Sequence, residues 1–167
     1  EIFTPLPDAK IYFFYYGIYL FDSTFTDITG NYNLQLPAGS YTVAAEKEGY
    51  RVMFSGNTSD PYFAQSVLLD SGQTINVDLA LPSIKNTGLS VSGILIDSVY
   101  GTPINKGVVV VRKGTHTPTL LKPNLLSADS SVYAGFVMSD GRYNINVEDS
   151  TYYFVQAYSG YYLPTYY

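Results

Sequence analysis

Cysteine and tryptophan are absent from the 167-residue chain, and histidine occurs once, as His116. Without cysteine there is no disulfide, thiolate nucleophile, iron–sulfur cluster or cysteine-ligated zinc. A single histidine also excludes a His-pair metal site and leaves little for a catalytic triad. Most classes of enzyme are therefore disfavoured, and we expect no catalytic residue and no cofactor.

Charge is scarce as well. Charged residues make up 14% of the chain, and 9 Lys and Arg stand against 14 Asp and Glu, for a net charge of −5. An acidic chain poor in lysine lacks the positive field that holds a phosphate backbone, so no nucleic-acid partner is expected. The most apolar run, from Ile11 to Phe21, is far shorter than the ~20 residues of a spanning helix, so no membrane span is expected.

The composition favours an exported protein. The chain is rich in Tyr, Thr, Ser and Asn and has no cysteine, which fits a protein that is stable outside the cell without disulfides. It begins at Glu1 without a charged, then apolar, leader, so we expect that any targeting signal was removed or not included. We expect an extracellular or cell-surface location.

Alternation of apolar and polar residues dominates the chain. Such a period of two is typical of strands with one buried face. It occurs in residues 32–36, 75–81 and 143–147, while residues 11–16 and 108–111 are continuous apolar runs typical of central strands. Clusters of Gly, Pro, Asn and Asp separate these segments. The predicted fold class is all-β, with antiparallel β-sandwiches.

An internal repeat is the most informative feature of the sequence. Residues 27–36 align with 138–147, residues 4–6 with 102–104, and residues 11–13 with 109–111. Continued forward, the alignment places Tyr41 on Tyr152 and Val43 on Phe154. The repeat predicts two tandem modules, 1–83 and 89–167, joined by a linker over 84–88, with an insertion around 114–137 in the second.

The first copy carries a spaced motif, which reads Asp27-x-x-Gly30-x-Tyr32-x-Leu34-x-Leu36-Pro37-Ala38-Gly39-x-Tyr41-x-Val43 and continues to Gly49-Tyr50. The second copy carries Asp140-Gly141-x-Tyr143-x-Ile145-x-Val147 and later Gly160-Tyr161. This pattern resembles the carboxypeptidase regulatory-like domain, also called transthyretin-like or prealbumin-type. Residues 91–97 and 101–104 resemble the opening strand and turn of that family. The resemblance implies Ig-like sandwiches of about seven strands that serve as non-catalytic domains of exported proteins.

Glycines mark the turns of this motif. A glycine adopts positive φ without steric cost, and Asp140-Gly141 is a strong turn dipeptide. The predicted motif turns contain Gly30, Gly39, Gly49, Gly141 and Gly160.

Each module lacks one terminal strand of the pattern. The first has nothing that matches the opening strand at 89–97, and the second has nothing that matches the closing strand at 74–81. An open sheet edge favours capture of a strand from another chain. Three explanations remain open: the chain is a window of a longer tandem protein, subunits exchange strands, or the chain completes itself internally.

Tyrosine is too abundant, with 18 residues, to lie wholly in the interior. Tyrosine is favoured at interfaces because it buries a large area at low entropic cost. The interface candidates are Tyr15, Tyr16, Tyr161, Tyr162, Tyr166 and Tyr167.

These features predict a non-enzymatic extracellular structural protein. It would be the subunit of a filament, tube or surface layer that self-associates by β-strand complementation between subunits, or associates with neighbouring modules of its own chain. The alternative is an adhesion or carbohydrate-binding module of a larger secreted or surface protein. An enzyme would require a cleft with a pair of perturbed carboxylates.

The sequence contains candidates for one modification site and one metal site. Asn57-Thr58-Ser59 is a sequon for N-glycosylation in a polar loop. Calcium is the metal that clustered turn carboxylates would take, but the spacing here does not match an EF-hand loop, and turn carboxylates are usually structural. The carboxylates concerned are Asp27, Asp140, Glu148 and Asp149.

Overall fold

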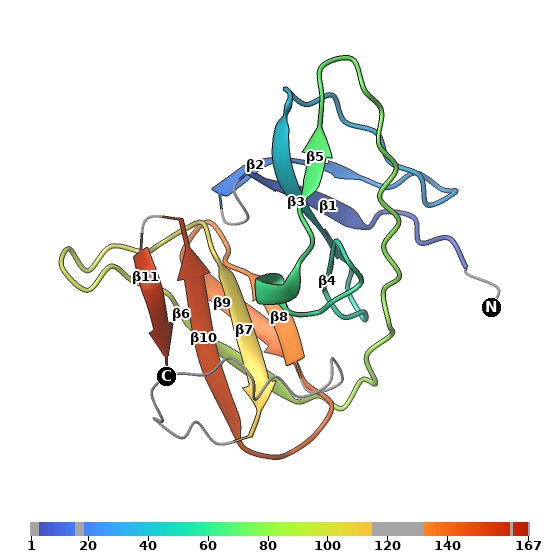
Figure 1. Ribbon diagram of the computed structural model, residues 1–167. Coiled ribbons are helices and arrows are strands. Elements are labelled where there is room, and N and C mark those ends of the chain that lie inside the picture. The colour runs from blue at the N-terminus through green and yellow to red at the C-terminus, as the bar shows by residue number, and fades with distance from the viewer. Residues whose placement is uncertain (1–3, 16–18, 115–131, 161, 167) are drawn as a thin grey trace. The chain divides into compact units, whose positions relative to one another are not determined.

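The computed structural model describes residues 4–15, 19–114, 132–160 and 162–166, and side chains up to residue 160. The chain divides into two compact units, Glu1–Ile84 (unit 1) and Lys85–Tyr167 (unit 2). Strands in antiparallel sheets dominate both units, and the helical structure of the described residues is one short 3-10 turn, η1 (Pro61–Phe63) (Figure 1). The predicted all-β fold class is confirmed.

Unit 1 is built on one antiparallel sheet. Its strands are β1 (Lys10–Tyr15), β2 (Tyr19–Phe25), β3 (Gly39–Glu46), β4 (Met53–Phe54) and β5 (Val67–Leu69). The strand order is β2-β1-β3-β4, and β5 pairs with the first residues of β3.

Unit 2 contains two sheets. Its strands are β6 (Ser90–Ile94), β7 (Val108–Lys113), β8 (Val132–Phe136), β9 (Arg142–Asn146), β10 (Tyr153–Ser159) and β11 (Tyr162–Tyr166). The larger sheet has the order β8-β7-β10-β11, and β6 pairs with β9 in a separate two-stranded sheet.

The continuous apolar runs form the central strands. In β1, Ile11 and Phe13 belong to the core of unit 1, with Val43 of β3 beside them. In β7, Val109 and Val111 are fully buried in the core of unit 2. Strands with apolar residues on both faces lie in the middle of a sheet because neighbours cover both edges and other layers cover the faces.

The two units repeat one hydrogen-bonding arrangement. The strand order of the large sheet is the same in both. The turn before residue 31 has the bonds Asp27 N to Asn31 O and Gly30 N to Asp27 O. The turn before residue 142 has the corresponding bonds, Met138 N to Arg142 O and Gly141 N to Met138 O.

One part of the sequence alignment is wrong by one residue. In unit 1, Val43 lies opposite Phe13. Phe13 aligns with Val111 in unit 2, and the residue opposite Val111 is Val155, whereas the alignment predicted Phe154. Tyr152, which the alignment placed on Tyr41, is 77% exposed. The connection that replaces Pro37-Ala38-Gly39 in unit 2 is one residue longer, which shifts the inward face of β10.

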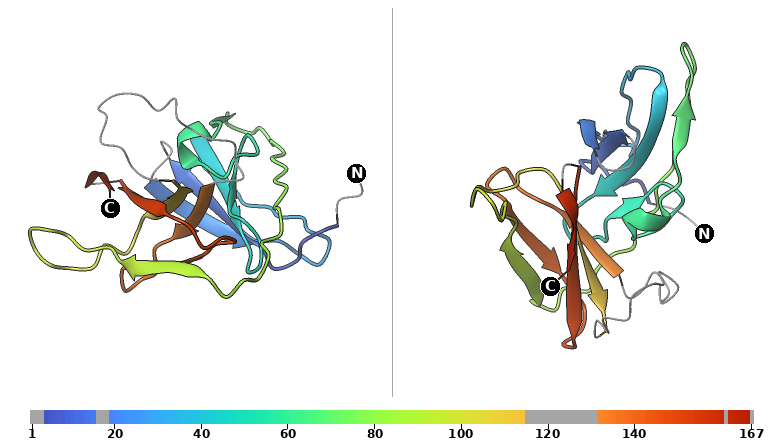
Figure 2. Two further views of the ribbon diagram at one scale, coloured as in Figure 1. Left: turned by 90° about the horizontal axis from the view of Figure 1, so that it is seen from below. Right: turned by 60° about the vertical axis from the view of Figure 1, so that its left-hand side comes forward.

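The alternating segments at 32–36 and 75–81 are not strands in this structure, although both were predicted to be. Their side chains alternate as expected, with Tyr32, Leu34 and Leu36 half-buried and their polar neighbours exposed. Both segments are extended but have no ladder partner in the described part of the chain. Figures 1 and 2 show the second segment as a long coil that leads away from β5.

Candidate strand-binding groove

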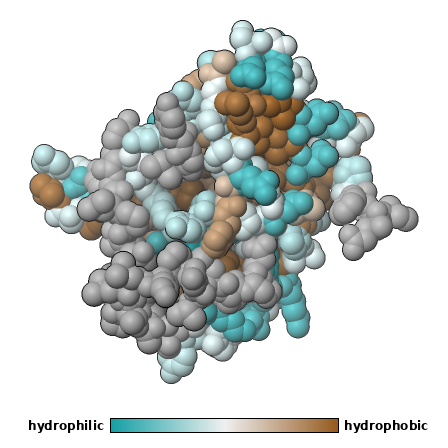
Figure 3. Space-filling model, in the orientation of Figure 1, coloured by the Kyte–Doolittle hydropathy of each residue, from teal (hydrophilic) through white to brown (hydrophobic). Residues whose placement is uncertain are grey.

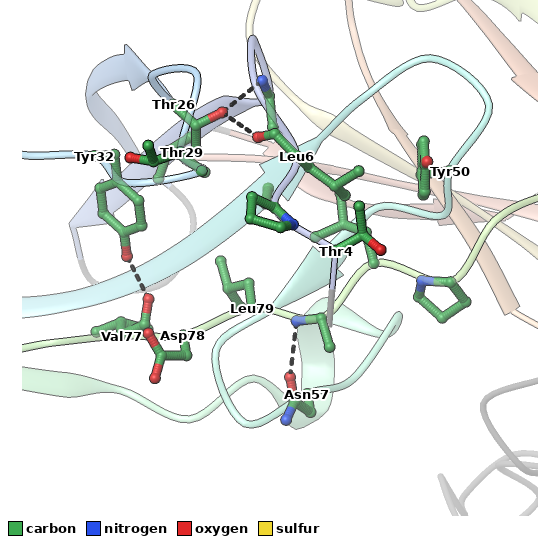
Figure 4. A pocket seen from close by; sticks show the side chains of 18 of the residues that line it. Thr4, Leu6, Thr26, Thr29, Tyr32, Tyr50, Asn57, Val77, Asp78 and Leu79 are labelled. Carbon is green, nitrogen blue, oxygen red and sulfur yellow. Dashed lines mark hydrogen bonds between the residues drawn. The ribbon is translucent and has the colours of Figure 1, made fainter. Parts of the chain in front are cut away.

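A groove of about 900 Å³ lies in unit 1 between these two extended segments (Figure 4). Gly30 and Tyr32 line it on one side, and residues 77–83 line it on the other. The floor of the groove is apolar and lies on the side of the main sheet, where it is lined by Ala9, Ile11 and Ala45. The remaining lining residues are Thr4, Pro5, Leu6, Thr26, Thr29, Tyr50 and Asn57.

The two segments pack on the core of unit 1 through their inward side chains. These side chains are Tyr32, Leu34, Leu36, Val77, Leu79 and Leu81, and all of them contact the buried cluster around Phe13 and Val43. The segments therefore occupy the position of a second sandwich layer.

Their backbones lack the pairing that such a layer normally has. None of the N–H groups of residues 32–36 or 75–79 donates to another backbone group in the described part of the chain. Unpaired backbone groups along an extended segment are the donors and acceptors that a further strand uses. The groove is thus bordered by two open backbone edges, one on each segment. We call the space between these two edges the lane.

A tyrosine side chain bridges the lane. The Tyr32 hydroxyl donates to the Val77 carbonyl oxygen at 2.6 Å, and Figure 4 shows this bond across the groove. Burial, and to a smaller extent the Asp78 charge, raises the pKa of Tyr32 to about 12. A neutral hydroxyl is thus held as a donor between two segments that share no ladder.

Unit 2 shows what fills the corresponding lane there. Strand β6 pairs with β9, with Val91 opposite Ile145 and Gly93 opposite Tyr143. Beyond the ladder, Leu95 N donates to Gly141 O at 2.7 Å and Ile104 N donates to Leu95 O at 2.9 Å.

The same groups have no partner in unit 1. By the sequence repeat, Gly30 corresponds to Gly141 and Leu6 to Ile104. Among the described residues, Gly30 O accepts no backbone hydrogen bond and Leu6 N donates none. The groove is therefore the place that Leu95 and its strand occupy in unit 2.

The predicted turn glycines at 30 and 141 have matching environments. Gly30 has φ of 77° and Gly141 of 82°, a region that favours glycine. A Cβ would stand 3.1 Å from the Pro5 Cβ in the first case and 2.8 Å from the Pro103 Cβ in the second. Each turn thus packs tightly on the corresponding proline of its own unit.

The other predicted turn glycines have different positions. Gly39 is the first residue of β3, where a Cβ would stand 2.7 Å from the Tyr15 ring, so packing rather than a turn requires glycine. Gly49 lies in a turn with φ of 81°. Gly160 lies in the turn after β10.

Of the interface candidates, only Tyr15 has a described side chain. Its ring packs within unit 1, with centroids 5.5 Å from Tyr41 and 6.4 Å from Phe21. Tyr16, Tyr161 and Tyr167 lie outside the described residues, and Tyr162 and Tyr166 are placed only as backbone of β11. An interface role for this set remains a prediction.

The four carboxylates that were candidates for calcium binding have local partners. Asp27 accepts bonds from Thr29 Oγ1 and the backbone N–H groups of Thr29 and Asn31, and these hydrogen bonds lower its pKa. Asp149 pairs with Lys113 at 2.8 Å. Asp140 lies 3.3 Å from the Arg142 Nε, and Glu148 accepts from Lys85 N. In the described ranges, no three His, Asp or Glu side chains gather closely enough to hold a metal ion.

Asn57 lies at the rim of the groove, with φ of 55°, and its Oδ1 accepts from Ala80 N at 3.5 Å. Its modification remains a prediction. His116 and most of the predicted insertion at 114–137 fall outside the described residues.

The carbohydrate-binding alternative depends on exposed coplanar rings, and it also remains a prediction. The exposed pair Tyr62 and Phe63 meets edge to face, at 87°.

No helix in the described part of the chain has the length and apolar character needed to cross a membrane.

The sequence pattern predicted the alternation of the two segments and placed Tyr32 in the motif, but it did not indicate that the Leu6 N–H and the Gly30 carbonyl are open bonding groups. The signal was present, because Thr4-Pro5-Leu6 repeats Thr102-Pro103-Ile104. The repeat alone does not determine which backbone groups bond to each other, because that pairing depends on the fold.

No family model, curated protein or solved structure matches this chain. The fold defines the chain as an all-β protein of antiparallel sheets.

Proposed function

We propose that this chain is a non-enzymatic structural subunit that accepts a β-strand from a neighbouring polypeptide and so assembles into an extracellular filament, tube or surface layer. The observation that carries the proposal is the pair of extended segments in unit 1, which flank an apolar groove without a ladder between them. Strand addition to such an edge supplies main-chain hydrogen bonds for affinity and side-chain sockets for specificity.

The surface of unit 1 supports association. Phe21, Phe25 and Leu68 are 49%, 58% and 64% exposed. Figure 3 shows a hydrophobic area around the position of β5, the strand that contains Leu68. A surface with so few charges offers little electrostatic resistance to contact between copies.

The likeness of the two units supports a tandem origin. They share strand order and the bonds of one turn, and the sequence motif runs through both. We propose on this basis that both are modules of the carboxypeptidase regulatory-like kind, carried by an exported protein.

Self-assembly of the purified chain tests the function. Sedimentation velocity over a hundredfold range of concentration, with electron microscopy of the concentrated sample, should show oligomers that grow with concentration. A chain that stays monomeric throughout, with the circular dichroism of a folded β protein, would contradict the proposal.

A matched pair of variants links assembly to the groove. Ala9→Leu adds a side chain at the floor of the groove and should reduce assembly, because the added atoms occupy the lane. Ala38→Leu makes the same change at an exposed position and should assemble as the parent does. Equal assembly of both folded variants would place the contact elsewhere.

A further inference from the structure

The arrangement in unit 2 specifies which strand unit 1 accepts. We infer that the groove of unit 1 binds an extended strand of the pattern apolar–x–Gly–x–apolar, antiparallel to residues 30–36. This inference rests on the proposed function and states the chemistry of the donor strand.

The central glycine is required by a tyrosine. In unit 2, a Cβ added to Gly93 would stand 2.6 Å from the Tyr143 hydroxyl oxygen. Tyr32 corresponds to Tyr143, and its ring spans the lane of unit 1 to reach Val77. A side chain at the donor position opposite Tyr32 therefore meets the ring, and glycine leaves room for it.

The second apolar position fills the groove. In unit 2, Leu95 lies near Gly107, where an added Cβ would stand 3.5 Å from the Leu95 Cδ2. Ala9 corresponds to Gly107 and lies on the floor of the groove, with Ile11 beside it. An aliphatic side chain at this donor position enters an apolar socket and releases water from it.

Backbone groups fix the register. In antiparallel pairing, every second residue exchanges hydrogen bonds with its opposite residue. The bonds of Leu95 to Gly141 and Ile104 set that phase in unit 2. In unit 1 the same phase brings the second apolar residue of the donor strand between Gly30 O and Leu6 N. The glycine of the donor strand then lies opposite Tyr32, and its first apolar residue lies opposite Leu34.

A synthetic peptide of residues 89–97, with a solubilising lysine tail, tests the inference on the full chain. It should bind, shift the amide resonances of Tyr32 and Leu34, and slow hydrogen exchange there. A Gly93→Val peptide should bind about tenfold more weakly or worse, because the added side chain overpacks against Tyr32. A Ser92→Val peptide, changed at an exposed position, should bind like the parent peptide.

Three results would overturn the inference: no binding at millimolar peptide, equal binding of the Gly93→Val peptide, or protection confined to another edge such as β2. These results are separable from the assembly test. A monomeric chain that binds the peptide with this glycine dependence retains the inference and loses the proposed function. A chain that assembles without protection at Tyr32 and Leu34 retains the function and loses the inference.

Discussion

At the scale of single residues, Tyr32 has the clearest consequence for stability against pH. Its pKa rises from 10.0 to about 12 in the folded chain, so the fold favours the neutral hydroxyl. This contribution is fully present below pH 10 and is lost as the pH rises towards 12 because the unfolded chain then ionises more readily than the folded chain. Denaturant unfolding of the parent and of Tyr32→Phe should be measured across this pH range. The free energy of unfolding should fall more steeply with pH in the parent than in the variant.

Ultraviolet titration provides the control for that prediction. The phenolate absorbance of the parent should include a tyrosine that titrates near pH 12 and that Tyr32→Phe lacks. Burial and the hydrogen bond to Glu46 raise the pKa of Tyr12 further, so its signal stays in the variant. A Tyr32→Phe titration identical to that of the parent would contradict the assignment.

The turn glycine at 141 allows a second residue-scale prediction. Gly141→Ala forces an L residue into positive φ and brings a Cβ 2.8 Å from the Leu95 carbonyl oxygen. Gly101→Ala has a similar φ of 67° with nothing within 4 Å. The backbone conformation alone costs about 1–2 kcal/mol, and the contact adds to it only at 141. Thermal unfolding should therefore give a lower melting temperature for Gly141→Ala than for Gly101→Ala. Equal melting temperatures would show that the turn at Gly141 relaxes to remove the contact.

At the scale of strands, burial of the continuous apolar runs determines stability. Val111 on β7 is fully buried, whereas Val99 in the same unit is 79% exposed. Val111→Ala removes two methyl groups from a packed interior, at about 2 kcal/mol including the cavity. Val99→Ala should change the free energy of unfolding by less than about 0.5 kcal/mol. Chemical denaturation of both variants measures the difference, and similar values would contradict the assignment of β7 to the core.

The same scale shows what the sequence could and could not predict. The apolar runs at 11–16 and 108–111 predicted central strands because few other arrangements bury both faces, and β1 and β7 lie there. Alternation predicted which side chains of 32–36 point inward, because that depends on the segment itself. It did not predict the absence of a ladder, because pairing depends on a neighbouring strand. The sequence also did not predict that the connection after Val147 is one residue longer than its counterpart in unit 1. A longer turn leaves the alternation of the next strand intact, so the pattern of that strand does not reveal the shift.

At the scale of the whole molecule, two units with similar sheets differ in one layer. In unit 2 that layer is the β6–β9 pair, and in unit 1 it is the two extended segments with the groove between them. A backbone without partners is satisfied by water, and a donor strand replaces water with protein bonds at modest net gain for each bond. Burial of the aliphatic donor side chain in the groove adds the larger part of the driving force.

This difference predicts that a donor strand stabilises one unit selectively. At a concentration 100 times its dissociation constant, the peptide of residues 89–97 should stabilise unit 1 by about 2.7 kcal/mol and leave unit 2 unchanged. Calorimetry of the full chain measures this, with Val43→Ala and Val111→Ala identifying the transitions of unit 1 and unit 2 through their cores. Only the transition that Val43→Ala lowers should rise with peptide. A rise confined to the transition that Val111→Ala lowers would mean that the peptide pairs with the open edge of β6 or β9 instead, and the groove of unit 1 would then lose its role as acceptor.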